Sequence, residues 1–184
     1  RRHQLGKDRL MAQYTGTFET GVDGNSISTG DAGSATAWNT VVSTANSTQT
    51  YSNVQKYGSL SQRVVNNATP DNGYVQWTNS TLGTSLTTHW GRYYLFLPSG
   101  HDQALIFVRG LDEAGVRAWE LLLNTDLTVS VRDAGGTARG TSTTALATNQ
   151  WVRVEWNGVH STTAGFIECK IFNSAESGNE IGRA

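Results

Sequence analysis

Aromatic and charged side chains occur at alternate positions in several stretches of this sequence, and that combination could bind a sugar. Flat aromatic rings stack on sugar rings, while guanidinium and carboxylate groups bond to sugar hydroxyls. In WVRVEWNGV, residues 151–159, apolar side chains alternate with Arg153 and Glu155, which in a strand places the two sets on opposite faces. The candidate glycan-binding residues are Arg92, Tyr94, Trp119, Arg153 and Glu155.

The same residues allow two simpler interpretations. Arg153 and Glu155 could pair with charged residues on neighbouring strands of a solvated sheet, beside packed aromatic residues. The face could also be covered by residues 25–47, which are rich in Ser, Thr, Ala and Asn and are expected to form a long loop around Trp38. Cross-strand pairing of Arg153 and Glu155 is favoured, and ligand binding is the second interpretation.

Other reactive side chains show no arrangement typical of a metal or nucleophilic site. The four histidines lack the spacing of a zinc site: His3, His89, His101 and His160. Asp23 and Asn25, with Glu19 nearby, could hold calcium, but an Asp-Gly turn is the simpler interpretation. The single cysteine, Cys169, alternates with isoleucines in FIECKIF and is expected to be buried and unreactive. We therefore expect no metal and no other cofactor.

Alternating apolar residues predict strands along most of the chain and no convincing helix. The expected strands are 15–19, 49–54, 59–65, 74–78, 91–97, 104–109, 116–123, 127–132, 151–157 and 166–172. Clusters of Gly, Asn, Asp and Pro separate them. Strands without helices to cover a parallel sheet indicate antiparallel sheets packed face to face. In that arrangement Val152, Val154 and Trp156 are expected to lie in the core.

Length and composition limit the classes of function. The 184 residues suffice for one domain with a real core. The 14 basic and 15 acidic residues are spread along the chain, without the basic stripe of a nucleic-acid-binding protein. No apolar run approaches the roughly 18 residues that cross a bilayer. Residues 1–10 are basic and polar and precede Met11, so we interpret them as an N-terminal extension and 11–184 as a single domain.

Several motifs follow one another in a suggestive order. They are FETG (18–21), HWGRYYLFLPS (89–99), ALIFVRGLDEAG (104–115), WELLLNTDLTVSVRDAGG (119–136), NQWVRVEWNGV (149–159) and GFIECKIFNS (165–174). This order resembles concanavalin A-like, laminin-G-like jelly-roll domains, which occur in phage virion proteins and bacterial carbohydrate-binding modules. The resemblance implies an all-β fold, an antiparallel jelly-roll sandwich of two sheets. Such domains end in a closing strand, which is expected here to come from elsewhere or to be missing after SGNEIGRA.

The resemblance also implies what an enzyme of this fold would need. Glucanases carry alternating acidic residues on one strand, which act as nucleophile and acid. No such run is present, and Glu155 and Glu168 each share a face with a cation, which favours the ionised form over the protonated form of a general acid. Residues of the kind that a polysaccharide lyase uses are present, without its motifs: His89, Arg92, Tyr93, Tyr94, Gln62 and Arg63. We expect no enzymatic activity.

The favoured function is a non-enzymatic structural or recognition module at a virion surface, such as a bacteriophage tail or capsid accessory protein, which could also bind a glycan. Phage structural proteins would reconcile an extracellular type of fold with a start at Met11 that lacks a signal peptide. The alternative is a carbohydrate-binding module of a secreted bacterial protein, and a lyase or glucanase is least favoured. Expected partners are neighbouring virion or assembly subunits in an oligomer and a cell-surface polysaccharide, but neither nucleic acid nor a membrane. The expected location is the virion surface or the extracellular space.

Overall fold

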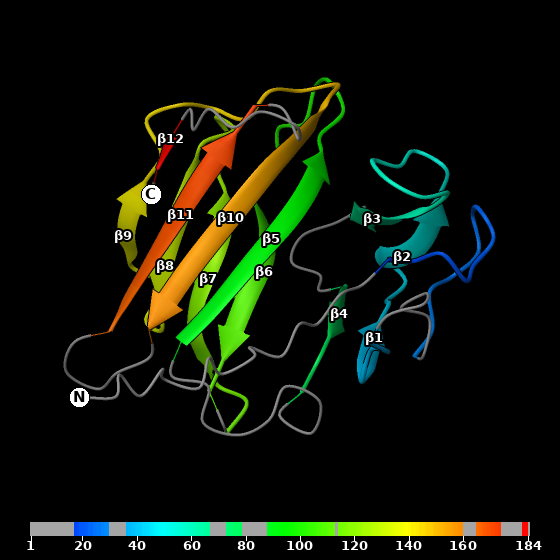
Figure 1. Ribbon diagram of the computed structural model, residues 1–184, viewed down its shortest axis with the longest axis horizontal. Helices are drawn as coiled ribbons and strands as arrows, with labels where there is room; N and C mark the ends of the chain where they lie inside the picture. Colours follow the sequence, from blue (N-terminus) through cyan, green and yellow to red (C-terminus); the bar gives the residue numbers. More distant parts are fainter. Residues whose placement is uncertain are drawn as a thin grey trace, which may run out of the picture. The chain divides into compact units, whose positions relative to one another are not determined.

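The computed structural model describes residues 17–29, 36–66, 73–78, 88–112, 114–159, 165–173 and 182–183 (Figure 1). The regular structure of these ranges consists of β-strands, and all the strand pairs are antiparallel. The all-β fold is therefore confirmed. No helix in these ranges is long and apolar enough to cross a membrane. Internal contacts divide the chain into two compact units, residues 1–83 and 84–184.

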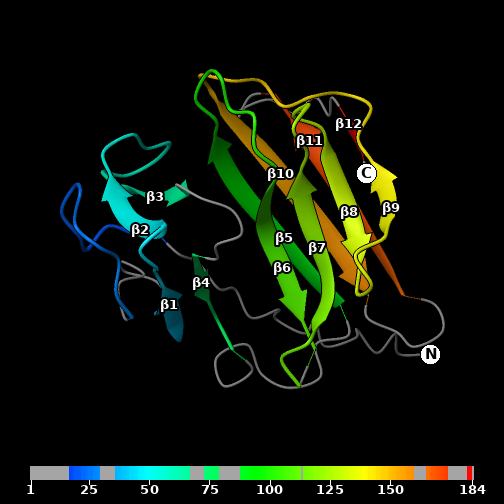
Figure 2. The same cartoon turned by 180° about the vertical axis from the view of Figure 1, so that it is seen from behind.

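The unit formed by residues 84–184 contains two four-stranded sheets. The first sheet has the order β12-β11-β10-β5, with bounds Gly182–Arg183, Phe166–Phe172, Trp151–Val159 and Thr88–Phe96. The second sheet has the order β6-β7-β8-β9, with bounds Leu105–Leu111, Arg117–Leu123, Val129–Asp133 and Ala138–Thr141. Figures 1 and 2 show these sheets face to face from opposite sides, an arrangement compatible with a β-sandwich.

Side chains from both sheets meet in one hydrophobic core. Leu121 of the second sheet and Val152 and Val154 of the first are all 0% exposed and belong to the same cluster. Trp156 packs against this cluster. The alternation of WVRVEWNGV therefore predicted correctly which face of β10 is buried, because one face of a strand must supply the core while the other faces away from it.

Three aromatic rings of this core lie over glycines of neighbouring strands. The directly opposite pairs are Trp156 with Gly91, Trp119 with Gly110, and His89 with Gly158. A Cβ atom at these glycines would lie 1.9, 2.1 and 2.5 Å from the respective ring. Glycine is therefore the residue that leaves room for each ring, and the ring in turn covers a stretch of strand that has no side chain of its own.

Two hairpins of the second sheet share one turn chemistry, in DEAGV (112–116) and DAGGT (133–137). The leading aspartate accepts a hydrogen bond from the backbone N–H four residues later, at 2.8 Å in the first loop and 2.9 Å in the second. The fourth residue of each loop is a glycine, and its φ is 78° at Gly115 and 84° at Gly136. Glycine enters this left-handed region without a steric penalty, so the sequence determines where each hairpin reverses.

The unit formed by residues 1–83 contains two short strand pairs and an aromatic cluster. The pairs are β1 (Thr40–Val42) with β4 (Tyr74–Gln76), and β2 (Ser47–Ser52) with β3 (Ser61–Asn66). In the cluster the ring of Trp38 stacks on Phe18 and Trp77, with centroid separations of 5.6 and 4.3 Å. The long loop expected over 25–47 thus contains a strand, β1, and Trp38 belongs to a small core of this unit.

Some strand boundaries differ from the expectation. Residues 17–19 do not form part of a strand, and Phe18 has a φ of 60°, which interrupts an extended chain. β5 begins at Thr88, three residues earlier than predicted, and β9 is a strand that the sequence did not predict. The expected boundary after residue 10 lies outside the described residues, so the single domain over 11–184 stays a prediction. Near the C-terminus, β12 pairs with Lys170 and Ile171 of β11.

Candidate functional site

The face of the first sheet that points away from the core carries most of the candidate residues. Because Val152 and Val154 point into the core, Arg153 and Glu155 lie on the opposite face of β10, and the strand register extends this face onto β5 and β11. We call it the outer face of the first sheet. It comprises Trp90, Arg92, Tyr94, Phe96, Trp151, Arg153, Glu155, Asn157, Phe166, Glu168, Lys170 and Phe172.

Directly opposite residues form rows across this outer face. The rows are Trp90–Asn157–Glu168, Arg92–Glu155–Lys170, Tyr94–Arg153–Phe172 and Phe96–Trp151. Charged groups occupy the middle of the face, while aromatic rings lie on both sides of them. The structure therefore brings four of the five predicted binding residues, Arg92, Tyr94, Arg153 and Glu155, into two adjacent rows.

Glu155 is the ionic centre of the outer face. The Arg92 Nε and Nη2 atoms lie 2.9 and 2.8 Å from Glu155 Oε1. The Arg153 Nε atom lies 3.1 Å from the same oxygen, within ion-pair distance but without hydrogen-bond geometry. The predicted cross-strand pairing of Glu155 is thus confirmed. Because the side chain of Arg92 is 56% exposed, its guanidinium group can still reach a ligand.

The aromatic residues of the outer face differ in how much ring surface they offer. The Arg153 guanidinium lies 4.0 Å above the ring of Phe172, which is only 6% exposed. Phe96 and Trp151 pack against each other at 5.6 Å. Trp90, by contrast, is 63% exposed. Its indole therefore offers the largest ring surface for stacking, next to the exposed Arg92 along the same face.

Trp119, the fifth predicted binding residue, does not join the other four. It belongs to β7 in the second sheet, is 7% exposed and lies in the core. Its ring stacks on His89 with centroids 5.0 Å apart and planes 10° from parallel. Trp119 and Leu121 both point into the core, whereas Glu120 between them points away from it, so the side chain of Trp119 has a packing role.

The β5 residues that could have supported lyase chemistry are divided between the two faces of that strand. His89 and Tyr93 point to the core side of β5, opposite to Arg92 and Tyr94. Desolvation raises the pKa of Tyr93, so its phenol stays protonated near neutral pH and is a poor base. Gln62 donates a hydrogen bond to the Gln49 side chain on the neighbouring strand β2.

The candidate calcium ligands support backbone turns instead. Glu19 accepts hydrogen bonds from the backbone N–H groups of Ser59 and Leu60 at 2.8 and 3.3 Å. Asp23 accepts one from Asn53 N at 3.1 Å. Across the ranges that the structure describes, no group of three or more His, Cys, Asp and Glu side chains could hold a metal ion. His3 and His160 lie outside these ranges.

Cys169 is 0% exposed and belongs to the core. Burial in apolar surroundings, with a smaller contribution from the nearby charge of Glu168, raises the pKa of the Cys169 thiol to about 12. A thiol with this pKa stays protonated at physiological pH and is a poor nucleophile. The expectation that Cys169 is a buried packing residue is confirmed.

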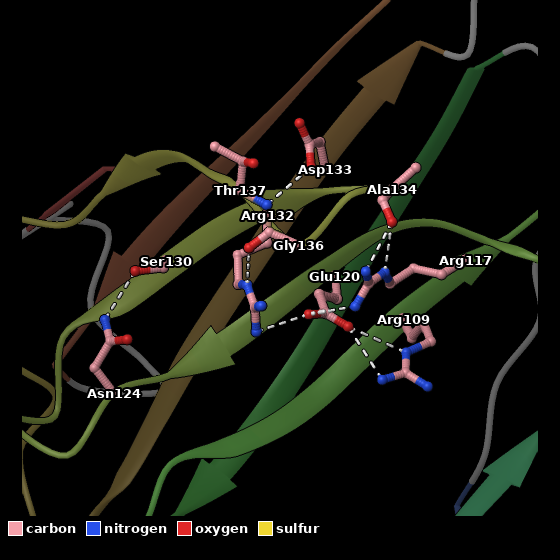
Figure 3. A network of polar contacts seen from close by, with 10 residues as sticks. All are labelled: Arg109, Arg117, Glu120, Asn124, Ser130, Arg132, Asp133, Ala134, Gly136 and Thr137. Atoms are coloured by element: carbon pink, nitrogen blue, oxygen red, sulfur yellow. Dashed lines mark hydrogen bonds and ion pairs between the residues drawn. The ribbon is translucent and has the colours of Figure 1, made fainter.

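An ionic cluster that sequence reasoning missed lies on the outer face of the second sheet (Figure 3). The carboxylate of Glu120 on β7 is 0% exposed, accepts hydrogen bonds from Arg109 and Arg117, and forms an ion pair with Arg132. The shortest separations are 3.1 Å to Arg109 Nη2, 3.3 Å to Arg117 Nη1 and 2.9 Å to Arg132 Nη1. These arginines come from β6, β7 and β8, so no local motif signals that they meet.

Trp90 is the other functional candidate that the sequence prediction omitted. The predicted strand began at residue 91, whereas β5 begins at Thr88 and places Trp90 in phase with Arg92 and Tyr94. The HWGRYY segment did contain this signal, since Trp90, Arg92 and Tyr94 alternate. A glycine inside a strand usually weakens it, but the ring of Trp156 covers Gly91 in this structure.

Comparisons of the chain with protein-family models, with curated proteins and with solved structures gave no match.

Proposed function

We propose that this chain is a non-enzymatic recognition module that binds a polysaccharide on the outer face of the first sheet. The observation that carries the proposal is the exposed indole of Trp90 beside the exposed guanidinium of Arg92, at the edge of rows that mix aromatic and charged side chains. An indole can stack on the apolar face of a sugar ring, and a guanidinium can donate hydrogen bonds to its hydroxyls.

Binding is favoured over catalysis by the state of Glu155. A retaining or inverting glycosidase needs one carboxyl group that is protonated and one that is free to attack or to activate water. Glu155 has two arginines on one of its oxygens, so the carboxylate holds Arg92 and Arg153 in place and is not free to attack or to activate water. Tyr93, whose pKa is raised by desolvation, is equally unsuited to serve as a lyase base.

For the fold, we propose the finer description of a concanavalin A-like jelly roll. Two facing antiparallel sheets, with a long connection between the paired strands β5 and β10, support it. For the setting, we propose that the module is a virion-surface component with neighbouring subunits as partners. Among the described residues, the short β12 pairs with Lys170 and Ile171 at the edge of β11, and unpaired backbone at a sheet edge is a template for strand addition by a neighbour.

The binding proposal is tested by affinity electrophoresis in gels that contain bacterial or plant polysaccharides. We expect one polysaccharide to retard the wild-type protein, and Trp90→Ala to weaken that interaction about tenfold or more, as loss of a central aromatic contact does. Tyr57→Ala, which removes a comparably exposed ring (54%) in the other unit, is the matched control. Equal retardation of wild type and Trp90→Ala would move the binding site away from this face.

The same incubations are assayed for new reducing ends and unsaturated sugars. Binding without product is the expected outcome, and turnover would overturn the non-enzymatic assignment. The virion setting is tested separately by size-exclusion chromatography and by pull-down with purified virion proteins. A monomer without affinity for virion proteins would exclude that setting and favour the alternative, a carbohydrate-binding module of a secreted bacterial protein.

A further inference from the structure

The three arginines around Glu120 carry more positive charge than that carboxylate neutralises. Glu120 balances one guanidinium, and Asp133 of the same sheet is engaged by Arg139 instead. Among the described residues, Glu120 is the acidic group that forms ion pairs with Arg109, Arg117 and Arg132, so one carboxylate faces three cations. Their side chains are 40%, 31% and 28% exposed, whereas Glu120 is 0% exposed. The carboxylate thus forms the floor of the cluster, and the cations form its accessible surface.

Glu120 and the hairpin loop of β8 and β9 fix the orientation of the guanidinium groups. Arg117 donates to the Ala134 carbonyl at 2.7 and 3.0 Å, and Arg132 donates to the Gly136 carbonyl at 2.7 Å (Figure 3). These bonds leave other N–H groups of the same cations unused. Within the described ranges, Arg109 Nη1 and Arg132 Nη2 have no protein acceptor.

Gly136 leaves room for two of the guanidinium groups. A Cβ atom at this position would lie 2.8 Å from Arg132 Nη2 and 3.2 Å from Arg117 Nη2. The Nη2 atoms of both arginines are therefore directed to the same small region beside the loop. Glu120 Oε1 lies near both guanidinium groups and offsets part of their mutual repulsion, and a second anion beside the loop would offset more of it.

We propose that the cluster of Arg109, Arg117 and Arg132 on the outer face of the second sheet is a binding site for an oxyanion, either a free anion of the size of sulfate or the acidic group of a saccharide. Guanidinium groups recognise carboxylate, sulfate and phosphate oxygens through paired N–H donors. Glu120 holds the three cations in place from below, so little order has to be created on binding. This site does not rest on the glycan site, which lies on the other sheet.

The direct test is NMR of the arginine side chains of the wild-type protein, titrated with sodium sulfate against sodium chloride at matched ionic strength. The Nε–Hε resonances of Arg109, Arg117 and Arg132 are expected to shift saturably with sulfate and not with chloride, while those of Arg92 and Arg139 stay constant. Equal responses to both salts would overturn the proposal. This measurement needs no variant, so it does not depend on whether a mutant folds.

Two variants then separate an anion site from a merely structural ion cluster. Arg109→Gln removes one guanidinium and is expected to weaken sulfate binding about tenfold or more. Glu120→Gln removes the internal counter-charge, so it is expected to bind sulfate more tightly than the wild type does, although the fold is less stable. If Arg109→Gln left sulfate binding unchanged, the cluster would be structural only. Arg139→Gln, whose cation is bonded to Asp133, is the control.

The source of the anion is distinguished with glucuronate and glucose in the same titration. Shifts with both sulfate and glucuronate, but not with glucose, would assign the site to the acidic group of a saccharide. Shifts with sulfate alone would assign it to a free anion. In either case the glycan-binding test with Trp90→Ala stands by itself, so that failure of one site is distinguishable from failure of the other.

Discussion

The indole of Trp156 lies over Gly91, directly across from it on the neighbouring strand, and occupies the space where any other residue would have its Cβ atom. The two residues form one packing unit. The ring fits only because Gly91 has no side chain, and the ring shields the backbone of Gly91 from solvent. Trp119 with Gly110 and His89 with Gly158 repeat the arrangement. These pairs give the core local determinants of stability that can be tested one at a time.

Trp156→Ala is expected to lower the free energy of unfolding by about 3–5 kcal/mol, as truncation of a large core aromatic does. The loss comes from the contacts of the ring with the core and from the uncovered backbone at Gly91. Urea denaturation monitored by circular dichroism measures it. Trp90→Ala on the adjacent strand, where the indole is 63% exposed, should change the same free energy by less than about 1 kcal/mol. Similar losses in both variants would contradict the assignment of the two faces.

Gly91→Ala is expected to destabilise the fold by about 1–3 kcal/mol, because its methyl group would lie 1.9 Å from Trp156 Cζ2 and the ring must move. Thermal denaturation compares this variant with Gly135→Ala, where the nearest atom is at 3.3 Å. The double variant Gly91→Ala with Trp156→Ala should lose less than the sum of the single losses. Strict additivity would show that the two residues act independently.

Glu120→Gln is expected to cost roughly 2–4 kcal/mol of stability in low-salt buffer. Loss of the buried carboxylate leaves three guanidinium groups without their shared negative charge, and their partial exposure keeps the cost below that of a fully buried ion pair. Glu155→Gln, in which the carboxylate is 28% exposed, is the matched control and should cost about 1 kcal/mol or less. Chemical denaturation measures the free energy of unfolding of both variants. A larger loss of stability in Glu155→Gln than in Glu120→Gln would contradict the expectation that the more buried carboxylate contributes more.

The pKa of about 12 for Cys169 predicts a specific loss of stability at high pH. A folded-state pKa above the unfolded value contributes stability that is complete below pH 9 and decreases as the pH rises toward 12. Between pH 8 and pH 10 this group should lower the free energy of unfolding by about 1.4 kcal/mol. Urea denaturation at both values, compared with Cys169→Ala, isolates the effect because the variant lacks the titrating thiol. If the free energy of unfolding depended on pH in the same way in the wild type and in Cys169→Ala, ionisation of this thiol would not contribute to the loss of stability.

The division of β10 into a core face and an outer face was predictable because one local signal, alternation, determines it. Val152 and Val154 are apolar, and Arg153 and Glu155 are charged, so only one orientation avoids burying unpaired charges. Cross-strand pairing of Glu155 followed from the same reasoning, whereas the identity of its partner, Arg92, came from the strand register. The face of the sheet on which a residue lies can thus be predicted from the sequence wherever the two faces differ clearly in polarity.

The orientation of β7 was harder to predict, because both of its faces are buried. Trp119 and Leu121 enter the core, yet Glu120 between them is also 0% exposed. Its burial depends on Arg109 and Arg132 from neighbouring strands, which are distant in sequence. A local pattern carries no information about such long-range partners, so Trp119 was assigned to a binding face and the arginine cluster was missed.

The strand order of the unit formed by residues 84–184 has a consequence for how the chain folds. β6, β7, β8 and β9 follow one another and pair through short loops, whereas β5 pairs with β10 only after the whole second sheet has been traversed. Closing that long loop costs more entropy than closing a hairpin. The second sheet, with its arginine cluster, should therefore gain amide protection before β5 in pulsed hydrogen exchange. Because the core takes side chains from both sheets, Arg92 and Glu155 are expected to meet in the same late step that completes the core.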